Sequence, residues 1–418
     1  MNLYDGKGNL IPVSGSTVEP MMGDVPRVYF TGEKPTGKNN VSAKMRYVSS
    51  TKDFEAYVLI KKQGSSSLQY PKANYTIAMY QDEAHAYKKK VNMRGWGEQS
   101  KFCLKANWVD LTHARNIVSA QLWSDIVASR SDYTEHPERL RKSPNNGAVD
   151  GFPIRVWYNG VYDGRYTWNI PKDAWMFYMD DSLDTHCVLC GESNTDAGTV
   201  FREETAINGS DWKDEIHDTC PLAIVTRWNE VINFVKDSTD DVFRKNLSNY
   251  INVNSAIDYF IFAYANGGID SLGKNQLYVT YDGNLWYASA YDLDETWGNG
   301  NRGVVNVSSS VAMQDGYNVV TLGKQTNLLY ERLASLFATE ITARYAELRE
   351  GALSEMNINN RFEAFADIVP SSIIAEDYAS TTGGGEFTEM PGQETNNIQQ
   401  IRQFIVDRLA YVDGILGG

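Results

Sequence analysis

The sequence has no long apolar run, no extended run of basic residues and no apolar leader. Because no apolar segment reaches about 18 residues, we expect no transmembrane helix. Residues 1–6 are polar and turn-like, so we expect no signal peptide and no export by the Sec route. The net charge is −14 and the longest basic run covers only residues 88–90, which argues against a nucleic-acid-binding protein.

What the sequence contains is typical of a folded protein with several parts. Its 418 residues are too many for one compact core and suffice for two or three packed units. The 25 Tyr, 15 Phe and 10 Trp indicate strand-rich structure and, more weakly, a secreted, surface or virion protein.

The order of the expected elements predicts an α+β protein with two lobes. Residues 1–45, rich in Gly, Pro, Ser and Thr, are interpreted as an N-terminal arm or attachment segment. Alternating patterns predict a strand-rich N-lobe over residues 46–178, with a helix at residues 111–128 packed on it. The polar residues 179–220 are interpreted as an inserted loop. Residues 221–418 are expected to form a helical C-lobe that contains one β-hairpin.

Apolar residues at helical spacing predict the main helices of the C-lobe. We expect helices at residues 222–234, 240–250 and 255–265, with Asn254 as the N-cap of the third. A long amphipathic helix is expected at residues 326–349 and a final one at about residues 398–416.

The residues best suited to chemistry lie in a loop and a hairpin between the helices of the C-lobe. Asp270 follows a helix that ends near Asn266, and Asn275 comes five residues later. The hairpin then returns the chain to Asp292-Leu293-Asp294, near the first loop. We therefore expect these carboxylates and the amide to lie close together.

This order favours phosphoryl transfer from ATP. A loop carboxylate such as Asp270 can accept the proton of a substrate hydroxyl, and protein kinases use the same Asp-x4-Asn spacing that separates it from Asn275. The oxygen ligands of Asn275, Asp292 and Asp294 suit Mg²⁺ or Mn²⁺. The spacing leaves a second interpretation open, in which these residues only form turns and helix caps.

Several short segments, in a fixed order, resemble the CotH kinase family. Tyr291 with Asp292-Leu293-Asp294 resembles the W/Y-D-x-D element of that family, and residues 251–261 with Asp270 and Asn275 resemble its helix and catalytic loop. The other similar segments are Gly64-Ser65-Ser66-Ser67 with Tyr70-Pro71-Lys72 and Tyr75, Leu104-Lys105-Ala106-Asn107 with Asp110 and Ala114-Arg115-Asn116, Tyr158-Asn159-Gly160 with Gly164-Arg165-Tyr166, Arg344-Tyr345 with Leu348-Arg349, and Ile401-Arg402 with Arg408. The resemblance extends over roughly residues 46–416.

The resemblance implies an atypical protein kinase, similar to secretory kinases, that transfers the γ-phosphoryl group of ATP to Ser or Thr of a protein. It implies that Asp270 is the catalytic residue, that Asp292 and Asn275 hold the metal, and that Lys72 contacts the ATP phosphates. The phosphate loop has the single glycine Gly64, so the hydroxyls of Ser65, Ser66 and Ser67 would have to contact phosphate.

Other basic residues compete for the phosphate, and the usual partner of the kinase lysine is missing. Lys105 is the alternative to Lys72, and Arg115 either binds phosphate or pairs with an acid inside the fold. The helix at residues 111–128 contains no Glu, so no Lys–Glu ion pair of the kinase type is visible, and Glu98 is a possible substitute.

Three of the four cysteines fall within residues 179–220. Cys187 and Cys190 form a C-x-x-C pair, and His217 and Cys220 follow. One interpretation is a Cys3His zinc site, and the other is a set of unpaired thiols in a loop.

The start of the chain suggests where the protein works. Residues 3–12 resemble the start of phage tail and baseplate proteins of Gram-positive hosts, which implies a virion component that contacts other virion proteins through the arm. The alternative location is the cytoplasm of the producing cell. The sequence does not identify the protein substrate.

Two rival functions remain open. The first is a catalytically inactive protein that keeps the kinase fold as a structural or receptor-binding part of a phage tail. The second is a carbohydrate-binding or hydrolytic surface protein in which Asp270 and Asp292 act as an acid/base pair.

Overall fold

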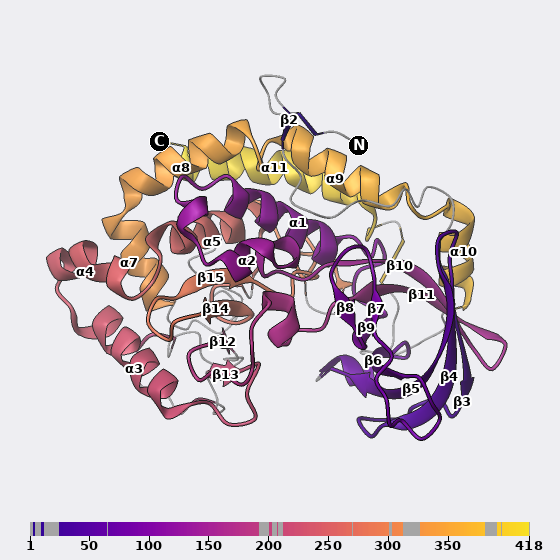
Figure 1. Cartoon of the computed structure of the whole chain (residues 1–418). Helices are drawn as coiled ribbons and strands as arrows, with labels where there is room; N and C mark the ends of the chain where they lie inside the picture. The colour runs from indigo at the N-terminus through magenta and orange to yellow at the C-terminus, as the bar shows by residue number, and fades with distance from the viewer. Residues whose placement is uncertain are drawn as a thin grey trace.

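A closed β-barrel, a four-stranded sheet, two small two-stranded sheets and a set of helices make up the described part of the protein in its computed structural model (Figure 1). The structure describes residues 3–4, 10–11, 25–64, 66–191, 200–202, 207, 212–269, 271–300, 303–311, 327–380, 391–393 and 395–417. The expected α+β class is confirmed. Among the described residues, no helix is both long enough and apolar enough to span a membrane.

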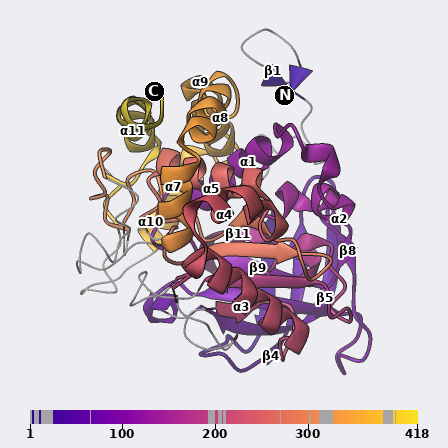
Figure 2. The same ribbon diagram turned by 90° about the vertical axis from the view of Figure 1, so that its left-hand side faces the viewer.

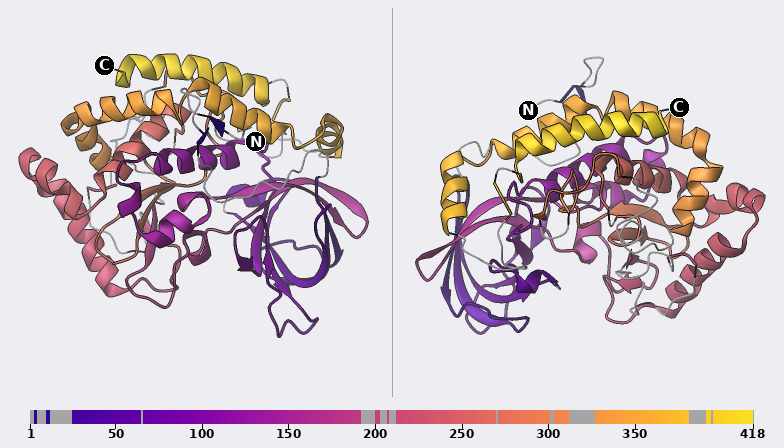
Figure 3. Two further views of the ribbon diagram at one scale, coloured as in Figure 1. Left: turned by 45° about the horizontal axis from the view of Figure 1, so that its top comes forward. Right: turned by 180° about the vertical axis from the view of Figure 1, so that it is seen from behind.

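A closed barrel of seven strands forms the N-terminal lobe, and the left view of Figure 3 looks into it. Around the barrel the strands are β10 (Gly151–Tyr158), β11 (Val161–Asn169), β9 (Lys101–Lys105), β6 (Asn74–Tyr80), β5 (Asp53–Gln63), β4 (Val41–Val48) and β3 (Arg27–Gly32). β3 closes the barrel by pairing in parallel with β10, and the other neighbours are antiparallel. Closure removes the sheet edges. The strand-rich lobe was expected, but a closed barrel is not a typical N-lobe of a kinase.

The barrel starts earlier in the chain than we expected. β3 lies wholly within residues 1–45, which we had interpreted as an arm, and Val28 and Phe30 on this strand are buried. The alternating pattern of β3 covers only six residues and becomes meaningful only beside its partner strands. Ahead of it, β1 (Leu3–Tyr4) and β2 (Leu10–Ile11) pair with each other.

A four-stranded antiparallel sheet lies in the second lobe. Its order is β13 (Trp212–Asp214), β12 (Cys187–Gly191), β14 (Gln276–Thr280) and β15 (Tyr287–Ala290). β14 and β15 form the expected hairpin. β12 and β13 lie within residues 179–220, so this segment is not merely an inserted loop. Every residue of β12 is buried, and such a short strand, covered on both faces, lacks the alternation that reveals strands in a sequence.

The helices of the C-terminal lobe partly follow the expected pattern. α3 (Leu222–Asp237), α4 (Asp240–Asn246), α5 (Val253–Asn266) and α11 (Ile398–Leu416) were expected. The N-cap of α5 is Asn252, which accepts a hydrogen bond from the Ser255 amide, and not Asn254. The single helix expected at residues 326–349 is split at Phe337 into α7 (Leu328–Leu336) and α8 (Ala338–Glu350).

Two helices near the C-terminus were not expected. They are α9 (Glu355–Ala366) and α10 (Ser371–Ser380). α9 packs beside α11, with α8 near them (Figure 2), whereas α10 packs against β11 of the barrel (Figure 1). Helix α10 therefore connects the C-terminal segment to the N-terminal lobe. The short elements are β7 (Val91–Asn92), β8 (Glu98–Gln99) and α2 (Glu138–Lys142).

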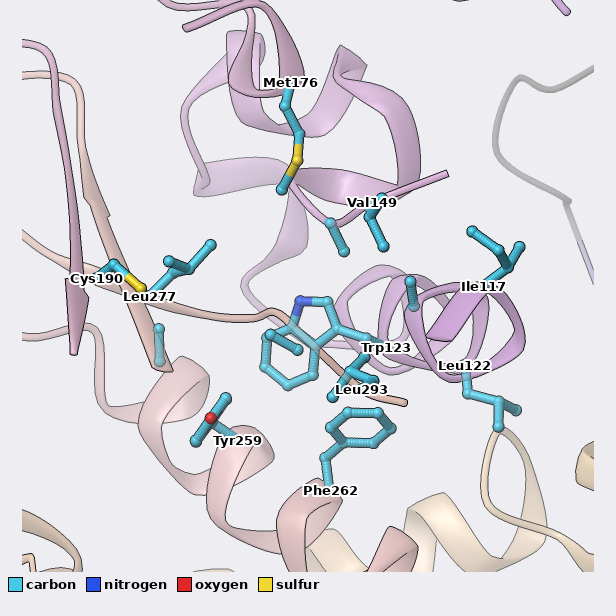
Figure 4. Packing of buried hydrophobic residues seen from close by; sticks show 14 of the residues in the cluster. Ile117, Leu122, Trp123, Val149, Met176, Cys190, Tyr259, Phe262, Leu277 and Leu293 are labelled. Atoms are coloured by element: carbon cyan, nitrogen blue, oxygen red, sulfur yellow. The ribbon is translucent and has the colours of Figure 1, made fainter. Parts of the chain in front are cut away.

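Helix α1 (Arg115–Ala128) packs against α5 and α9 of the C-terminal lobe, and not on the strands as we expected. Trp123 on α1 is fully buried, and its ring centroid lies 5.9 Å from that of Tyr259 and 5.6 Å from that of Phe262, both on α5 (Figure 4). Leu293, which follows β15, belongs to the same group of side chains (Figure 4). α1 therefore supports the segment that carries the expected metal ligands.

Candidate functional site

A cavity of about 640 Å³ is lined by residues of the barrel and of the C-terminal lobe. The barrel contributes residues from β5, β6, β9 and their loops, and the second lobe contributes residues at the ends of β13, β14 and β15. The residues expected in the site that line this cavity are Lys72, Lys105, Asn275, Asp292 and Asp294. The structure thus brings together residues that are far apart in the sequence.

The hairpin β14–β15 places Asn275 near Asp292. Gln276 pairs with Ala290 at the open end of the hairpin, so the residues just outside this pair leave the sheet side by side. Asn275 and Asp292 both have left-handed backbone conformations, with φ of 59° and 57°. The amide of Asn275 donates to the Gly191 carbonyl at 3.0 Å, which fixes this conformation against β12. Asn and Asp adopt it more readily than other non-glycine residues.

Helix α1 fixes the loop that carries Asp292 and Asp294. The backbone amide of Leu293, between them, donates to Asn116 Oδ1 at 3.2 Å. Farther along, Trp297 Nε1 donates to the Ser119 hydroxyl at 2.8 Å. Asn116 also lines the cavity. Our sequence interpretation did not assign Asn116 to the site, although it belongs to a segment that resembles CotH kinases.

The cavity is rich in positive charge although the chain is acidic. The described residues that line it include six lysines and four carboxylates, while the whole chain has a net charge of −14. The lysines are Lys72, Lys101, Lys105, Lys172, Lys213 and Lys274, and the acids are Glu215, Asp292, Asp294 and Glu295. Such a mixture fits an anion held together with a metal ion, because the lysines attract phosphate and the carboxylates bind the cation.

Lys105 faces the carboxylate side of the cavity. Its pKa is raised, because the effect of burial, which lowers it, is outweighed by the nearby Tyr291, Cys103, Asp292 and Asp294. Lys105 is therefore a firmly charged ammonium beside the expected metal ligands. Oxygen ligands from carboxylates and an amide, with a lysine near them, fit Mg²⁺ or Mn²⁺ with bound phosphates.

Lys72 has an acidic partner that the sequence did not reveal. Its ammonium donates to Asp377 Oδ1 at 2.8 Å and to the Arg165 carbonyl at 2.5 Å, and both side chains of the ion pair are buried. Asp377 lies on α10, 305 residues farther along the chain. The pair resembles in kind the Lys–Glu pair of protein kinases. The substitute that we considered, Glu98, lies on β8 and is exposed.

The loop after β5 borders the cavity, but not through the residues that we expected. Gly64 and Ser67 line it. A Cβ on Gly64, which has φ of 126°, would lie 1.9 Å from the Ser67 hydroxyl, so this tight loop requires glycine. Ser65 lies outside the described residues. Ser66 begins a short 3-10 helix, Ser66–Gln69, and its side chain is outside the described part of the structure.

Arg115 is not a phosphate ligand in this structure, because it does not line the cavity. It is fully buried and forms an ion pair with Asp110. It also donates to the Thr296 carbonyl at 3.1 Å and to the side chains of Asn396 at 2.8 Å and Gln400 at 2.5 Å. Arg115 therefore joins the start of α1 to α11, which is the second of the two roles that its sequence context allowed.

Lys172 contacts Glu215 and Tyr291 in the wall of the cavity. Lys172 forms an ion pair with Glu215 at 2.9 Å, and its ammonium lies 4.0 Å from the ring centroid of Tyr291. Burial and the nearby Asp292 raise the pKa of Tyr291 to about 12, although Lys172 and Lys105 lower it. Tyr291 is thus a neutral hydroxyl next to the metal ligands. Neither Glu215 nor Lys172 belongs to a sequence motif that indicated a site residue.

Asp270, the expected catalytic residue, lies outside the described residues. Its described neighbours are fixed: the Ser271 carbonyl accepts a hydrogen bond from the Tyr259 hydroxyl at 2.7 Å, and the Ser271 amide donates to Gly268 at 3.0 Å. The position of the Asp270 carboxylate relative to Asp292 therefore stays a prediction.

The cysteines do not group as the C-x-x-C pattern suggested. Cys187 and Cys190 both lie on β12, and residues three apart on a strand point to opposite faces. The Cys190 thiol lies 3.5 Å from the Lys172 ammonium, on the side of the cavity. Cys187 lies on the other side, where burial and the nearby Cys220 and Asp214 raise the pKa of its thiol. The predicted Cys3His zinc site is therefore wrong in one member, because Cys190 points to the opposite face of β12 from Cys187.

A lysine-rich cavity with carboxylate and amide oxygen atoms thus lies between a strand-rich lobe and a helical lobe. A family model described as CotH kinase protein matches residues 210–412. This match confirms the resemblance to CotH kinases over β13–β15 and most of the helical lobe. The barrel precedes the matched region. No curated protein matches the chain.

Proposed function

We propose that the protein binds ATP with Mg²⁺ or Mn²⁺ in the cavity between its lobes and transfers the γ-phosphoryl group to Ser or Thr of a protein. The observation that carries this proposal is the meeting of Asn275, Asp292 and Asp294 with Lys72 and Lys105 around one cavity. The match to CotH kinases over residues 210–412 supports it independently.

Each residue would have a distinct part in the reaction. Asn275, Asp292 and Asp294 would hold the metal ion, which neutralises charge on the phosphates when it is bound. Lys105 and Lys72 would bind phosphate oxygens, with Lys72 oriented by Asp377 in the way that an acid orients the kinase lysine. Asp270 would accept the proton of the substrate hydroxyl.

The transfer step is tested with labelled ATP, Mn²⁺ and a generic protein substrate. We expect the wild-type protein to transfer label to itself or to the substrate. We expect Asp270→Ala to bind ATP normally and to transfer nothing, because its part concerns the hydroxyl and not the nucleotide. Transfer by Asp270→Ala at the wild-type rate would contradict the role of this carboxylate.

An inactive outcome would also be informative. If the wild-type protein binds ATP in the presence of metal but never transfers label, the kinase fold serves as a scaffold, and a structural or receptor-binding role in a phage tail takes the place of catalysis. Detection of the protein in purified phage particles by mass spectrometry would test that role.

A further inference from the structure

A second cluster of metal-binding side chains lies behind the cavity, at the strands β12 and β13. The Cys187 thiol, a carboxylate oxygen of Asp214 and a ring nitrogen of His217 lie within 4.8 Å of one another. Cys220 lies beside the cluster, because its thiol is close enough to Cys187 to raise the pKa of the Cys187 thiol. All four side chains are buried or nearly so: Cys187 and Asp214 are buried, Cys220 is 9% exposed, and so is the side chain of His217.

The chemistry of the cluster favours a soft or borderline cation. Two thiols and an imidazole are the donors of structural zinc sites, where the ligands lie about 3–4 Å apart around the ion. Hard cations such as Mg²⁺ prefer oxygen ligands and would choose the other site of this protein. The two sites of this chain therefore differ in the metals that they select.

The histidine of the cluster faces its carboxylate. His217 Nδ1 lies 2.7 Å from Asp214 Oδ2, so this nitrogen and this oxygen can both reach one ion bound between them. An ion bound there would replace the hydrogen bond that joins the two side chains.

The backbone also holds the cluster in shape. Asp214 Oδ1 accepts hydrogen bonds from the amides of Ile216 at 2.9 Å and His217 at 3.2 Å, so Asp214 fixes the turn that carries the histidine. β13 pairs with β12, which brings Leu189 opposite Asp214. The cluster thus rests on two strands and one tight turn.

We propose that Cys187, Asp214, His217 and Cys220 bind one structural Zn²⁺ ion. Each thiol that binds the ion loses its proton to solvent. The ion would lock β12, β13 and the start of α3 together. The same turn places Glu215 in the cavity, where it pairs with Lys172 and Lys213. Zinc would therefore support the wall of the nucleotide cavity without taking part in phosphoryl transfer.

The test is the metal content of the full-length protein, measured by mass spectrometry after purification in zinc-containing buffer and gel filtration without free metal. We expect about one zinc ion per chain. We expect Cys187→Ser, His217→Gln and Cys220→Ser each to lose it. The matched control is Cys190→Ser, which removes a buried thiol of the same C-x-x-C pair and should keep the zinc.

Cobalt substitution tests the ligands without relying on variants that could fail to fold. Co²⁺ bound to the wild-type protein should show a strong thiolate-to-cobalt charge-transfer band. Absence of this band and of stoichiometric zinc, or zinc loss in Cys190→Ser equal to that in Cys187→Ser, would overturn the proposal. Asp292→Asn should keep its zinc even where ATP binding is lost, so this result is separate from the test of the kinase function.

Discussion

Lys72 and Lys105 line the same cavity in very different surroundings. Lys72 is tied to Asp377 and the Arg165 carbonyl, whereas Lys105 is influenced by the carboxylates of Asp292 and Asp294. The resemblance to CotH kinases presented Lys72 as the phosphate-binding residue and Lys105 as its alternative. The sequence could not show Asp377, since an ion pair across 305 residues leaves no local pattern.

Replacing the two lysines should separate phosphate binding from stability. We expect Lys105→Ala to weaken ATP binding about tenfold, because it removes one charge-assisted contact. Lys72→Ala should also weaken binding and, in addition, lower the free energy of unfolding by about 3 kcal/mol, because Asp377 stays buried without its lysine. Isothermal titration with ATP and Mn²⁺ and urea unfolding measure the two effects. Equal loss of stability in both variants would contradict the distinction.

His113 is buried beside Lys72, Arg165 and Asp377, and it makes the stability of the fold depend on pH. Its pKa lies well below the usual value, because burial disfavours the imidazolium and Arg165 and Lys72 repel it. The folded protein keeps His113 neutral, while the unfolded chain protonates it below about pH 6.5. The stability contributed by this residue is therefore complete above that pH and is lost as the pH falls, by up to about 1.4 kcal/mol per pH unit.

Urea unfolding at about pH 7.5 and pH 5 tests this dependence. We expect His113→Asn to lose stability less steeply on acidification than the wild-type protein, because it has no imidazole to protonate. Asparagine also tolerates the left-handed backbone at this position, where φ is 57°. His85→Asn, which changes a histidine far from the cluster at a similar φ of 57°, should keep the wild-type slope. An unchanged slope in His113→Asn would refute the assignment.

At the scale of elements, the sequence predicted hairpins and amphipathic helices. It did not predict elements that are buried on both faces. β14–β15 and α11 show clear turn residues or helical periodicity in the sequence. β12 is buried throughout and β3 is short, so neither stands out before its partners are known. Helix α1 is buried on most of its surface, and its pattern therefore could not show which lobe it packs on.

The hairpin β10–β11 contains Gly164, where the close approach of helix α10 leaves no room for a side chain. Gly164 has φ of 120°, and a Cβ there would lie 2.7 Å from Asp377 Oδ1 and 2.7 Å from Lys72 Cε. We expect Gly164→Ala to lower the free energy of unfolding by about 2 kcal/mol and to weaken ATP binding, because it separates α10 from the barrel.

The same hairpin provides a control for backbone strain alone. Gly160 has φ of 81°, and a Cβ there meets nothing within 4 Å. Gly160→Ala should cost about 1 kcal/mol and leave ATP binding unchanged, because only its backbone conformation is disfavoured. If the two alanine variants are equally stable and bind ATP equally well, the contact of Gly164 with the Lys72–Asp377 pair is unimportant.

At the scale of the molecule, an acidic chain gathers lysines and carboxylates around a cavity between a barrel and a helical lobe. The order of Asn275 and Asp292 along the sequence predicted the carboxylate side of this cavity, and the position of Asp270 stays a prediction. The closed barrel and the lysines Lys101, Lys172, Lys213 and Lys274 were not predictable as a site, because they converge only through tertiary structure. The match to CotH kinases covers the lobe that the sequence predicted best.

The most direct test of the central claim is metal-dependent ATP binding by Asp292→Asn. This substitution keeps the size of the side chain but removes the charge that would hold the cation. We expect ATP with Mn²⁺ to raise the melting temperature of the wild-type protein and of Asp241→Asn, a control on the exposed start of α4. ATP with Mn²⁺ should not change that of Asp292→Asn. A wild-type protein that binds ATP with no divalent metal, or an Asp292→Asn variant that binds as well as the wild type, would contradict the account.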